Sequence, residues 1–299
     1  MSVAKDLPSL QEGFDQLGYV LDEELATILY LLLRLGKPLL LEGNPGVGKT
    51  QVANVLAQYL DTQLIRLQCY EGLDVNTAVY EWNYQKQLLS IKIQETGGKS
   101  ASEKEAHIFG EDFLLKRPLL QAITASKSPV LLIDEIDRAD EEFEAFLLEL
   151  LSAFQISIPE MGTIKASQPP FVILTSNRTR ELSDALKRRC LYHWVHYPDL
   201  EKEIRIVEKH LPTIESSLAT QLVQTVHLLR EKKLDKTPGI AETIDWANGL
   251  LALGYDTLST EAIAKSLGCV LKSADDITCL LYTSPSPRDQ RGSRMPSSA

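Results

Sequence analysis

A glycine-rich segment directly after an apolar run is the first part of this chain whose residue types could do chemistry. Residues 43–50 read GNPGVGKT, after the run at 39–41 and before a helical pattern at 51–60. The spacing G-x-x-x-x-G-K-T between a strand and a helix is that of a P-loop. Its glycines permit backbone conformations in which several N–H groups point at one phosphate. The residues expected to bind a nucleotide are Gly43, Asn44, Pro45, Gly46, Val47, Gly48, Lys49, Thr50 and Gln51.

Two side chains of this segment have distinct expected roles. The ammonium of Lys49 is placed to reach the β- and γ-phosphates of ATP, and the Thr50 hydroxyl is placed to bind Mg²⁺. The helix that starts near Lys49 adds the positive end of its dipole to the same region. ATP and Mg²⁺ are therefore the expected ligands.

Two adjacent carboxylates follow a second apolar run. Residues 130–133 read VLLI, and Asp134 and Glu135 come next. An aspartate at the end of a buried strand can hold Mg²⁺, directly or through water, and a glutamate beside it can act as the base that polarises an attacking water. Solvated acids at a strand end are the simpler interpretation, but the position after a P-loop favours the metal and base roles.

Further downstream, an asparagine and a pair of arginines complete a set suited to phosphate chemistry. Asn177 ends the apolar run 171–175 and can hydrogen-bond the γ-phosphate or the attacking water. Arg188 and Arg189 end a short helical segment, where basic residues commonly offset the helix dipole. In an oligomeric ATPase an arginine here reaches the nucleotide of a neighbouring subunit, and we favour Arg189 over Arg188 for that role.

The elements that must position these residues alternate between strands and helices. Such alternation predicts an α/β fold, a three-layer domain with a mostly parallel sheet, followed by a small all-helical domain. The predicted strands are 39–41, 62–68, 130–133, 171–175 and 191–196. The predicted helices of the first domain are 22–34, 51–60, 109–125, 141–154 and 181–189. We expect a weak lead-in at 1–19, the α/β core at 20–197, a hairpin near 155–165 and a helical lid at 198–278.

Two segments lack this periodicity. Residues 97–105 are small and polar, which is typical of an exposed loop. Residues 279–299 are rich in Ser, Pro and Arg and resemble translated vector sequence, so we expect a disordered tail that does not belong to the natural chain.

Composition and charge argue against several classes of protein. The chain has 299 residues, 44% of them hydrophobic, and a formal net charge of −10. A chain this acidic is not expected to bind nucleic acid generally, since phosphate affinity needs clustered Lys and Arg. The four cysteines form no CxxC pair, no apolar run is long enough to span a bilayer, and residues 1–10 lack the features of a signal peptide. We therefore expect a cytoplasmic protein with no membrane span.

Together these motifs resemble those of the AAA+ ATPases, in particular the MoxR branch. The resemblance rests on residues 43–50, 130–139, 176–177 and 186–189, and on the hairpin before the Asn177 strand, which is similar to the pre-sensor insert of that branch. Residues 67–74, 80–82 and 174–182 are most similar to a subgroup that includes the accessory ATPase of aerobic carbon monoxide dehydrogenase.

The resemblance implies a homo-oligomeric ring, usually a hexamer, that hydrolyses ATP and acts as a chaperone. Its client would be a metalloenzyme, in this subgroup a molybdenum hydroxylase whose metal centre is matured, and a partner with a von Willebrand factor A domain is implied. One feature departs from the pattern. The lid segment in which relatives present an arginine reads TPGIAE at 237–242 and has none.

Two other classes remain open at this point. A nucleic-acid remodelling ATPase of the same superfamily would show DNA-stimulated turnover, which the acidic balance disfavours. A P-loop kinase of a small metabolite would transfer phosphate to a new molecule, whereas Asp134, Glu135, the arginine pair and the separate lid favour hydrolysis.

Overall fold

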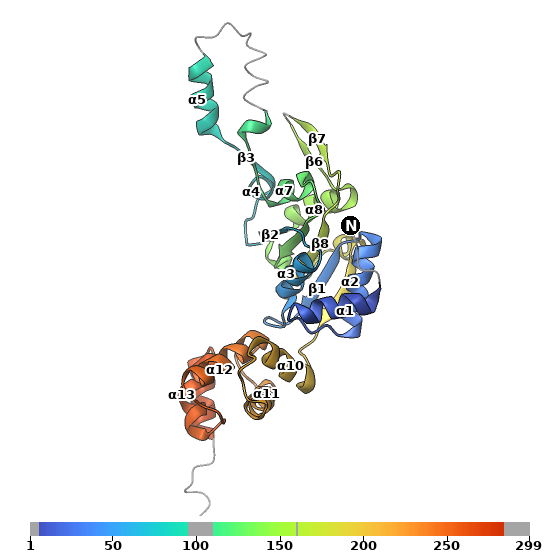
Figure 1. The fold of residues 1–299 in the computed structure, drawn as a ribbon. Helices are drawn as coiled ribbons and strands as arrows, with labels where there is room; N and C mark the ends of the chain where they lie inside the picture. Colours follow the sequence, from blue (N-terminus) through green and yellow to red (C-terminus); the bar gives the residue numbers. More distant parts are fainter. Residues whose placement is uncertain (1–5, 95–109, 160, 284–299) are drawn as a thin grey trace, which may run out of the picture. The chain divides into compact units, whose positions relative to one another are not determined.

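The computed structural model describes residues 6–94, 110–159 and 161–283, and divides into two compact units, Met1–His196 and Tyr197–Ala299. Figure 1 shows the strands in the first unit and a set of helices in the second. The predicted loop at 97–105 and most of the predicted tail lie outside the described residues.

A five-stranded, all-parallel sheet forms the centre of the first unit. Its strands lie in the order β2-β5-β8-β1-β9. Their bounds are Leu39–Gly43 for β1, Leu64–Gln68 for β2, Val130–Asp134 for β5, Phe171–Ser176 for β8 and Leu191–Val195 for β9. The register pairs Glu42 of β1 with Ser176 of β8, and Gln68 of β2 with Asp134 of β5. The predicted α/β class with a parallel sheet is confirmed, and the carboxyl ends of the strands meet at one edge.

Helices flank the sheet because its central strands are apolar on both faces. Every residue of β1 and β5 is buried, as expected for strands covered on two sides. Alternate residues such as Leu40, Leu131 and Leu174 pack with α7 (Pro118–Thr124), α8 (Glu141–Ala153) and α9 (Asp184–Arg189). The helix α3 (Lys49–Tyr59) contacts β1, β2, β5 and β8, and α2 (Glu23–Leu35) contacts β1 and β9.

The helix boundaries follow local capping chemistry. The Asp22 carboxylate accepts from the Leu25 backbone N–H at 2.7 Å at the start of α2, and Gly36 ends that helix in the left-handed conformation. Asp140 caps α8 in the same way, accepting from the Phe143 N–H at 2.9 Å. Both helices were predicted to within one residue.

The lead-in contains an element that the sequence did not predict. Helix α1 (Leu7–Gln16) begins at Asp6, whose side chain accepts from the Ser9 N–H at 2.9 Å. Its Leu10 and Phe14 are fully buried, and the Phe14 ring lies 5.8 Å from the ring of Tyr59 on α3. Residues 7–16 are therefore packed onto the P-loop helix, not merely leading into the domain.

The segment between β2 and β5 corrects another expectation. The predicted helix at 109–125 is wrong in its first half: a 3₁₀ turn, η1 (Glu111–Phe113), and the strand β4 (Leu114–Lys116) precede α7. β4 pairs antiparallel with β3 (Tyr80–Trp82), and Trp82 and Leu114, which face each other, are both buried. Tertiary pairing thus overrides the helical pattern. α4 (Val75–Val79) precedes β3, and α5 (Tyr84–Gln94) follows it and stands apart from the sheet in Figure 1.

The predicted hairpin is present. β6 (Gln155–Ile158) and β7 (Gly162–Lys165) pair antiparallel, with Ile156 opposite Ile164. Ile156 and Ile158 are buried while β7 is largely exposed, so one strand anchors the hairpin to the core.

In the second unit, the regular elements among the described residues are all helices. Its elements are α10 (Leu200–His210), α11 (Ser216–Arg230), α12 (Ile240–Ala252), α13 (Thr260–Val270) and α14 (Ala274–Thr283). Trp246 of α12 is fully buried, and its indole N–H donates to Ser266 of α13 at 2.7 Å. The expected start of a disordered tail at 279 is wrong, because α14 continues to Thr283. Across the described parts of both units, each helix is too short or too polar to cross a bilayer.

Candidate active site

The loop between β1 and α3 has the backbone geometry that the glycines predict. A Cβ on Gly43 would lie 2.4 Å from the Val195 carbonyl oxygen, so no larger residue fits there. Gly48 precedes α3 with φ of 90°, a conformation that side chains other than hydrogen disfavour. Both positions therefore require glycine for structural reasons as well as for phosphate approach.

Lys49 lies inside this loop. Its side chain is buried, and the ammonium donates to the carbonyl oxygens of Gly43 at 2.7 Å and Asn44 at 2.8 Å. Burial lowers the pKa of Lys49 to about 8, against the opposing field of Asp137, Asp134 and Glu135. Both direct partners of the ammonium are neutral carbonyl groups. A phosphate placed in the loop would give it a negatively charged partner and stabilise its protonated form.

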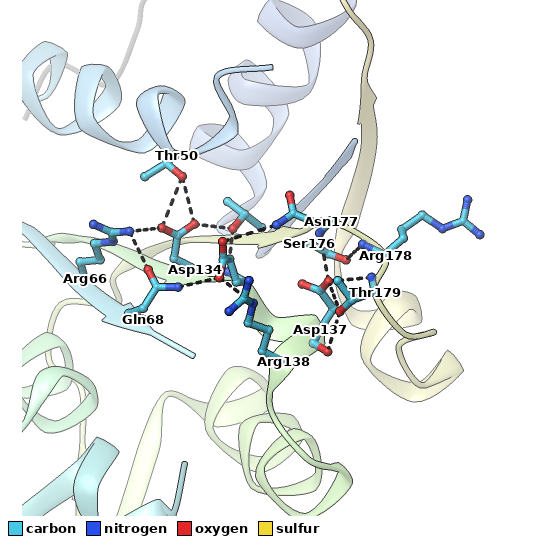
Figure 2. Close-up of polar contacts among 12 residues, drawn as sticks. Thr50, Arg66, Gln68, Asp134, Asp137, Arg138, Ser176, Asn177, Arg178 and Thr179 are labelled. Atoms are coloured by element: carbon cyan, nitrogen blue, oxygen red, sulfur yellow. Dashed lines mark hydrogen bonds and ion pairs between the residues drawn. The ribbon is translucent and has the colours of Figure 1, made fainter. Parts of the chain in front are cut away.

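Asp134 is the point at which three elements meet, as Figure 2 shows. Its carboxylate is almost fully buried at the end of β5. The Thr50 hydroxyl lies 3.1 Å from Oδ1 and 3.3 Å from Oδ2, the Thr175 hydroxyl of β8 donates to Oδ1 at 2.5 Å, and the Arg66 guanidinium of β2 donates to Oδ2 at 2.5 Å. The predicted metal ligands Thr50 and Asp134 are therefore in direct contact.

Glu135 follows in an unusual backbone conformation. Its φ of 54° and ψ of 50° place a non-glycine residue in the left-handed region, and its N–H donates to the Thr175 hydroxyl at 2.9 Å. The carboxylate accepts from the Gln68 amide at 3.1 Å, pairs with Arg138 at 2.9 Å, and lies 3.5 Å from the Asn177 amide nitrogen. A non-glycine residue in this conformation is strained, and such backbone strain often occurs at functional sites.

A third carboxylate holds the segment after β8 in place. Asp137, in the 3₁₀ turn η2 (Ile136–Arg138), accepts from the Asn177 N–H at 3.2 Å, the Thr179 N–H at 2.8 Å and the Thr179 hydroxyl at 2.7 Å. Burial raises the pKa of Asp137, but these hydrogen bonds outweigh burial and leave it below its usual value. The position of Asn177 beside Glu135 thus depends on Asp137.

The two arginines do not join this cluster. In the described residues, Arg189 donates from Nε to the Ser152 hydroxyl at 2.9 Å and from a terminal nitrogen to the Ala185 carbonyl at 3.1 Å. Arg188 is exposed at the end of the same helix. Because β9 begins at Leu191, opposite Leu39 at the start of β1, both arginines lie toward the edge of the sheet away from Asp134.

The oxygen donors near Thr50 fit Mg²⁺. Mg²⁺ usually binds one or two carboxylates and fills its other positions with water and phosphate oxygens, and a hydroxyl next to a buried carboxylate suits that pattern. Within the described residues, no group of three or more His, Cys, Asp or Glu side chains forms a metal site. A metal at Thr50 and Asp134 would therefore depend on the nucleotide for further ligands.

Further residues of this network do not stand out as site residues in the sequence, among them Arg66, Gln68, Thr175 and Asp137. Arg66 and Gln68 alternate with the buried Ile65 and Leu67 on β2, so the sequence places them on one exposed face. What the sequence does not reveal is that β2 neighbours β5, which brings that face to Asp134 and Glu135.

Comparison with known proteins bears on the family and the fold. Two uncharacterized proteins of Staphylococcus aureus, from strains bovine RF122 / ET3-1 and USA300, are each 29% identical over 174 residues. The match covers 56% of this chain and 59% of each relative, so the chain spans well under two thirds of their length. A point mutant of RuvB from Thermotoga maritima has the same fold, with a TM-score of 0.52 and 19% identity, over 86% of this chain and 72% of that protein.

A family assignment follows from the domain match. The sequence profile of the AAA domain, dynein-related subfamily, matches residues 38–190, from the start of β1 to the end of α9 and over half of the chain. This chain therefore belongs to the dynein-related subfamily of the AAA domain family and has the P-loop NTPase fold.

Proposed function

We propose that this protein is an Mg²⁺-dependent ATPase that converts ATP and water to ADP and phosphate. One observation carries the proposal: Thr50, the adjacent pair Asp134 and Glu135, and Asn177 come from three separate segments and converge at the carboxyl edge of the sheet, next to the P-loop. Open parallel sheets bind ligands at this edge.

The residues of the site divide the work between binding and proton transfer. Lys49 and the backbone N–H groups of residues 43–51 other than Pro45 bind the phosphates, and Lys49 exchanges its two carbonyl partners for phosphate oxygens. Glu135 accepts a proton from the attacking water, and Asn177 orients that water or the γ-phosphate. Mg²⁺ held by Thr50 and Asp134 would offset charge on the phosphate oxygens.

Replacing Lys49 by methionine tests the binding step. The variant keeps the buried aliphatic stem but loses the charge-assisted hydrogen bonds, so the Kd for ATP is expected to rise about 10- to 100-fold. Isothermal titration calorimetry with ATP measures this change. The matched control is Lys37→Met, an exposed lysine just before β1, which should bind ATP like the wild type. Unchanged ATP affinity in the Lys49 variant would exclude the P-loop as the nucleotide site.

We further propose that the protein works as a ring-shaped homo-oligomer, a hexamer, in which Arg189 reaches the nucleotide of the next subunit. The support is its position: Arg189 is exposed and contacts Ser152 rather than the site of its own chain. Arg188, one residue earlier on α9, is the alternative finger.

Mixing two inactive variants tests this arrangement. Arg189→Ala subunits keep an intact Glu135, and Glu135→Gln subunits keep an intact arginine. Mixed rings should therefore hydrolyse ATP faster than either variant alone, measured as phosphate release. A mixture no faster than the sum of its parts would contradict the trans arrangement, and Arg188→Ala in the same assay decides between the two arginines.

The cellular role that the motifs favour is that of a cytoplasmic MoxR-type chaperone. Residues 67–74, 80–82 and 174–182 support the subgroup whose client is a molybdenum hydroxylase such as carbon monoxide dehydrogenase, working with a von Willebrand factor A domain protein. Co-purification of such a client with the protein from its native host is the direct test. Recovery of the protein with DNA in salt-sensitive complexes would favour the nucleic-acid remodelling class instead.

A further inference from the structure

Arg66 makes a contact that the proposed hydrolysis does not use. It lies on β2, at the edge of the sheet, and one terminal nitrogen of its guanidinium donates both to Asp134 Oδ2 at 2.5 Å and to the Gln68 amide oxygen at 2.6 Å. Figure 2 shows the guanidinium beside the Asp134 carboxylate, with Thr50 facing the same carboxylate. A fixed positive charge thus lies against the carboxylate expected to bind the metal.

The two oxygens of Asp134 are engaged differently. Oδ1 accepts a 2.5 Å hydrogen bond from Thr175, a buried residue of the neighbouring strand β8. Oδ2 accepts from Arg66, whereas the Thr50 hydroxyl faces both oxygens, at 3.1 Å from Oδ1 and 3.3 Å from Oδ2. The oxygen that a metal ion next to Thr50 can take without disturbing the core is therefore the one that Arg66 occupies.

A guanidinium and a divalent cation cannot share that oxygen at low cost. The guanidinium offers only N–H donors and cannot ligate a metal, and the two positive charges repel at close range. The Arg66 side chain is 52% exposed whereas that of Asp134 is 4% exposed, so Arg66 is the partner able to move. After it leaves Asp134, Gln68 on the same strand remains available to it.

We propose that Arg66 is a built-in counter-ion of Asp134 that Mg²⁺ must displace when it binds with nucleotide. This inference rests on the proposed nucleotide site. Arg66 neutralises a buried carboxylate while no metal is bound, and it lowers the affinity of the site for metal. Mg²⁺ is consequently retained only together with a nucleotide, whose phosphates supply the other ligands.

The test compares the affinity for nucleotide without metal with the affinity in the presence of Mg²⁺. The affinity of the full-length protein for a fluorescent ADP analogue is measured in excess EDTA and in saturating Mg²⁺, for wild type and Arg66→Gln. We expect unchanged affinity in EDTA and a gain in affinity on adding Mg²⁺ that is about three- to fivefold larger in the variant, the size of a half-exposed ion pair. In a second measurement Mn²⁺ replaces Mg²⁺, and electron paramagnetic resonance measures the concentration of free Mn²⁺ in the presence of the protein and ADP. This concentration should be lower with Arg66→Gln than with wild type.

Arg138→Gln is the matched control. Arg138 is exposed to a similar extent, 55%, and pairs with Glu135 rather than Asp134. It should change the Mg²⁺ effect less than twofold if direct contact with Asp134 is what matters. Arg66→Lys, which keeps the charge, should fall between wild type and Arg66→Gln, and it provides the reading if the glutamine variant does not fold.

Each remaining outcome contradicts the inference. Equal Mg²⁺ effects in wild type and Arg66→Gln, or equal shifts in the Arg66 and Arg138 variants, would exclude a specific counter-ion. Weaker binding of the Mg²⁺ complex to Arg66→Gln would make Arg66 a phosphate ligand. If the wild-type protein does not bind ADP at all, the nucleotide-binding proposal fails, and this inference fails with it.

Discussion

Replacement of Glu135 by glutamine should lower the rate of ATP hydrolysis about 10²- to 10⁴-fold while leaving ATP binding intact. The amide cannot accept the proton of the attacking water, yet it has the shape of the carboxylate and can still accept from Gln68. The lost ion pair with Arg138 is half exposed and contributes little to stability. Phosphate release under saturating ATP measures the rate, and calorimetry measures the retained affinity.

A nearby acidic residue provides the control for this prediction. Glu142, in the first turn of α8, is exposed and belongs to the same unit, so Glu142→Gln should hydrolyse ATP at the wild-type rate. A drop of less than tenfold in the Glu135 variant would remove Glu135 as the base. A comparable drop in both variants would point to a general effect of net charge.

The central strands were predictable because they are continuous apolar runs. Residues 130–133 and 172–175 are buried, as expected for strands covered on both faces, and such runs have few alternatives in an α/β sequence. The segment from 80 to 116 was not predictable, because β3 and β4 are only three residues long and stabilise each other by pairing across more than thirty residues. Helix α1 was missed since its two buried residues, Leu10 and Phe14, form only one contact stripe.

The site divides in the same way. The motif residues Lys49, Thr50, Asp134 and Asn177 could be found from spacing, since each follows an apolar strand. The residues that hydrogen-bond these motif residues and fix their positions, such as Asp137, could not be found from spacing. The Asp137 hydrogen bonds require left-handed conformations at Glu135, with φ of 54°, and at Arg178, with φ of 58°, which neither residue type predicts.

The segment at 237–239 lies in the second unit, which is called the lid below after its predicted role. The segment contains no arginine of its own, and the Pro238 carbonyl accepts from Nε of Arg230, at the end of α11, at 2.8 Å. The same guanidinium makes two hydrogen bonds to Glu203 of α10, at 2.6 and 2.8 Å, and lies 4.6 Å from the centre of the Tyr197 ring. This arginine is therefore committed to the interior of the lid.

Replacement of Glu203 by alanine should destabilise the lid by about 3–5 kcal/mol, the cost of leaving a buried charge without its partner. Glu203 is fully buried and Arg230 is 9% exposed. Besides Arg230, Glu203 accepts from Thr243 of α12 at 2.8 Å and contacts His227 of α11 at 2.9 Å, so one side chain connects three helices. Urea unfolding followed by Trp246 fluorescence, with Trp82 and Trp194 replaced by phenylalanine, reports on the lid alone.

Two further variants separate the buried charge from the loss of any ion pair. Glu261→Ala removes the exposed pair with Lys265 on α13 and should leave the unfolding midpoint nearly unchanged. Glu203→Leu combined with Arg230→Met should be more stable than Glu203→Ala, because it removes the uncompensated guanidinium and fills the space with apolar atoms. If the double variant were as unstable as Glu203→Ala, the stability of the lid would come from the geometry of the Glu203 hydrogen bonds rather than from charge compensation.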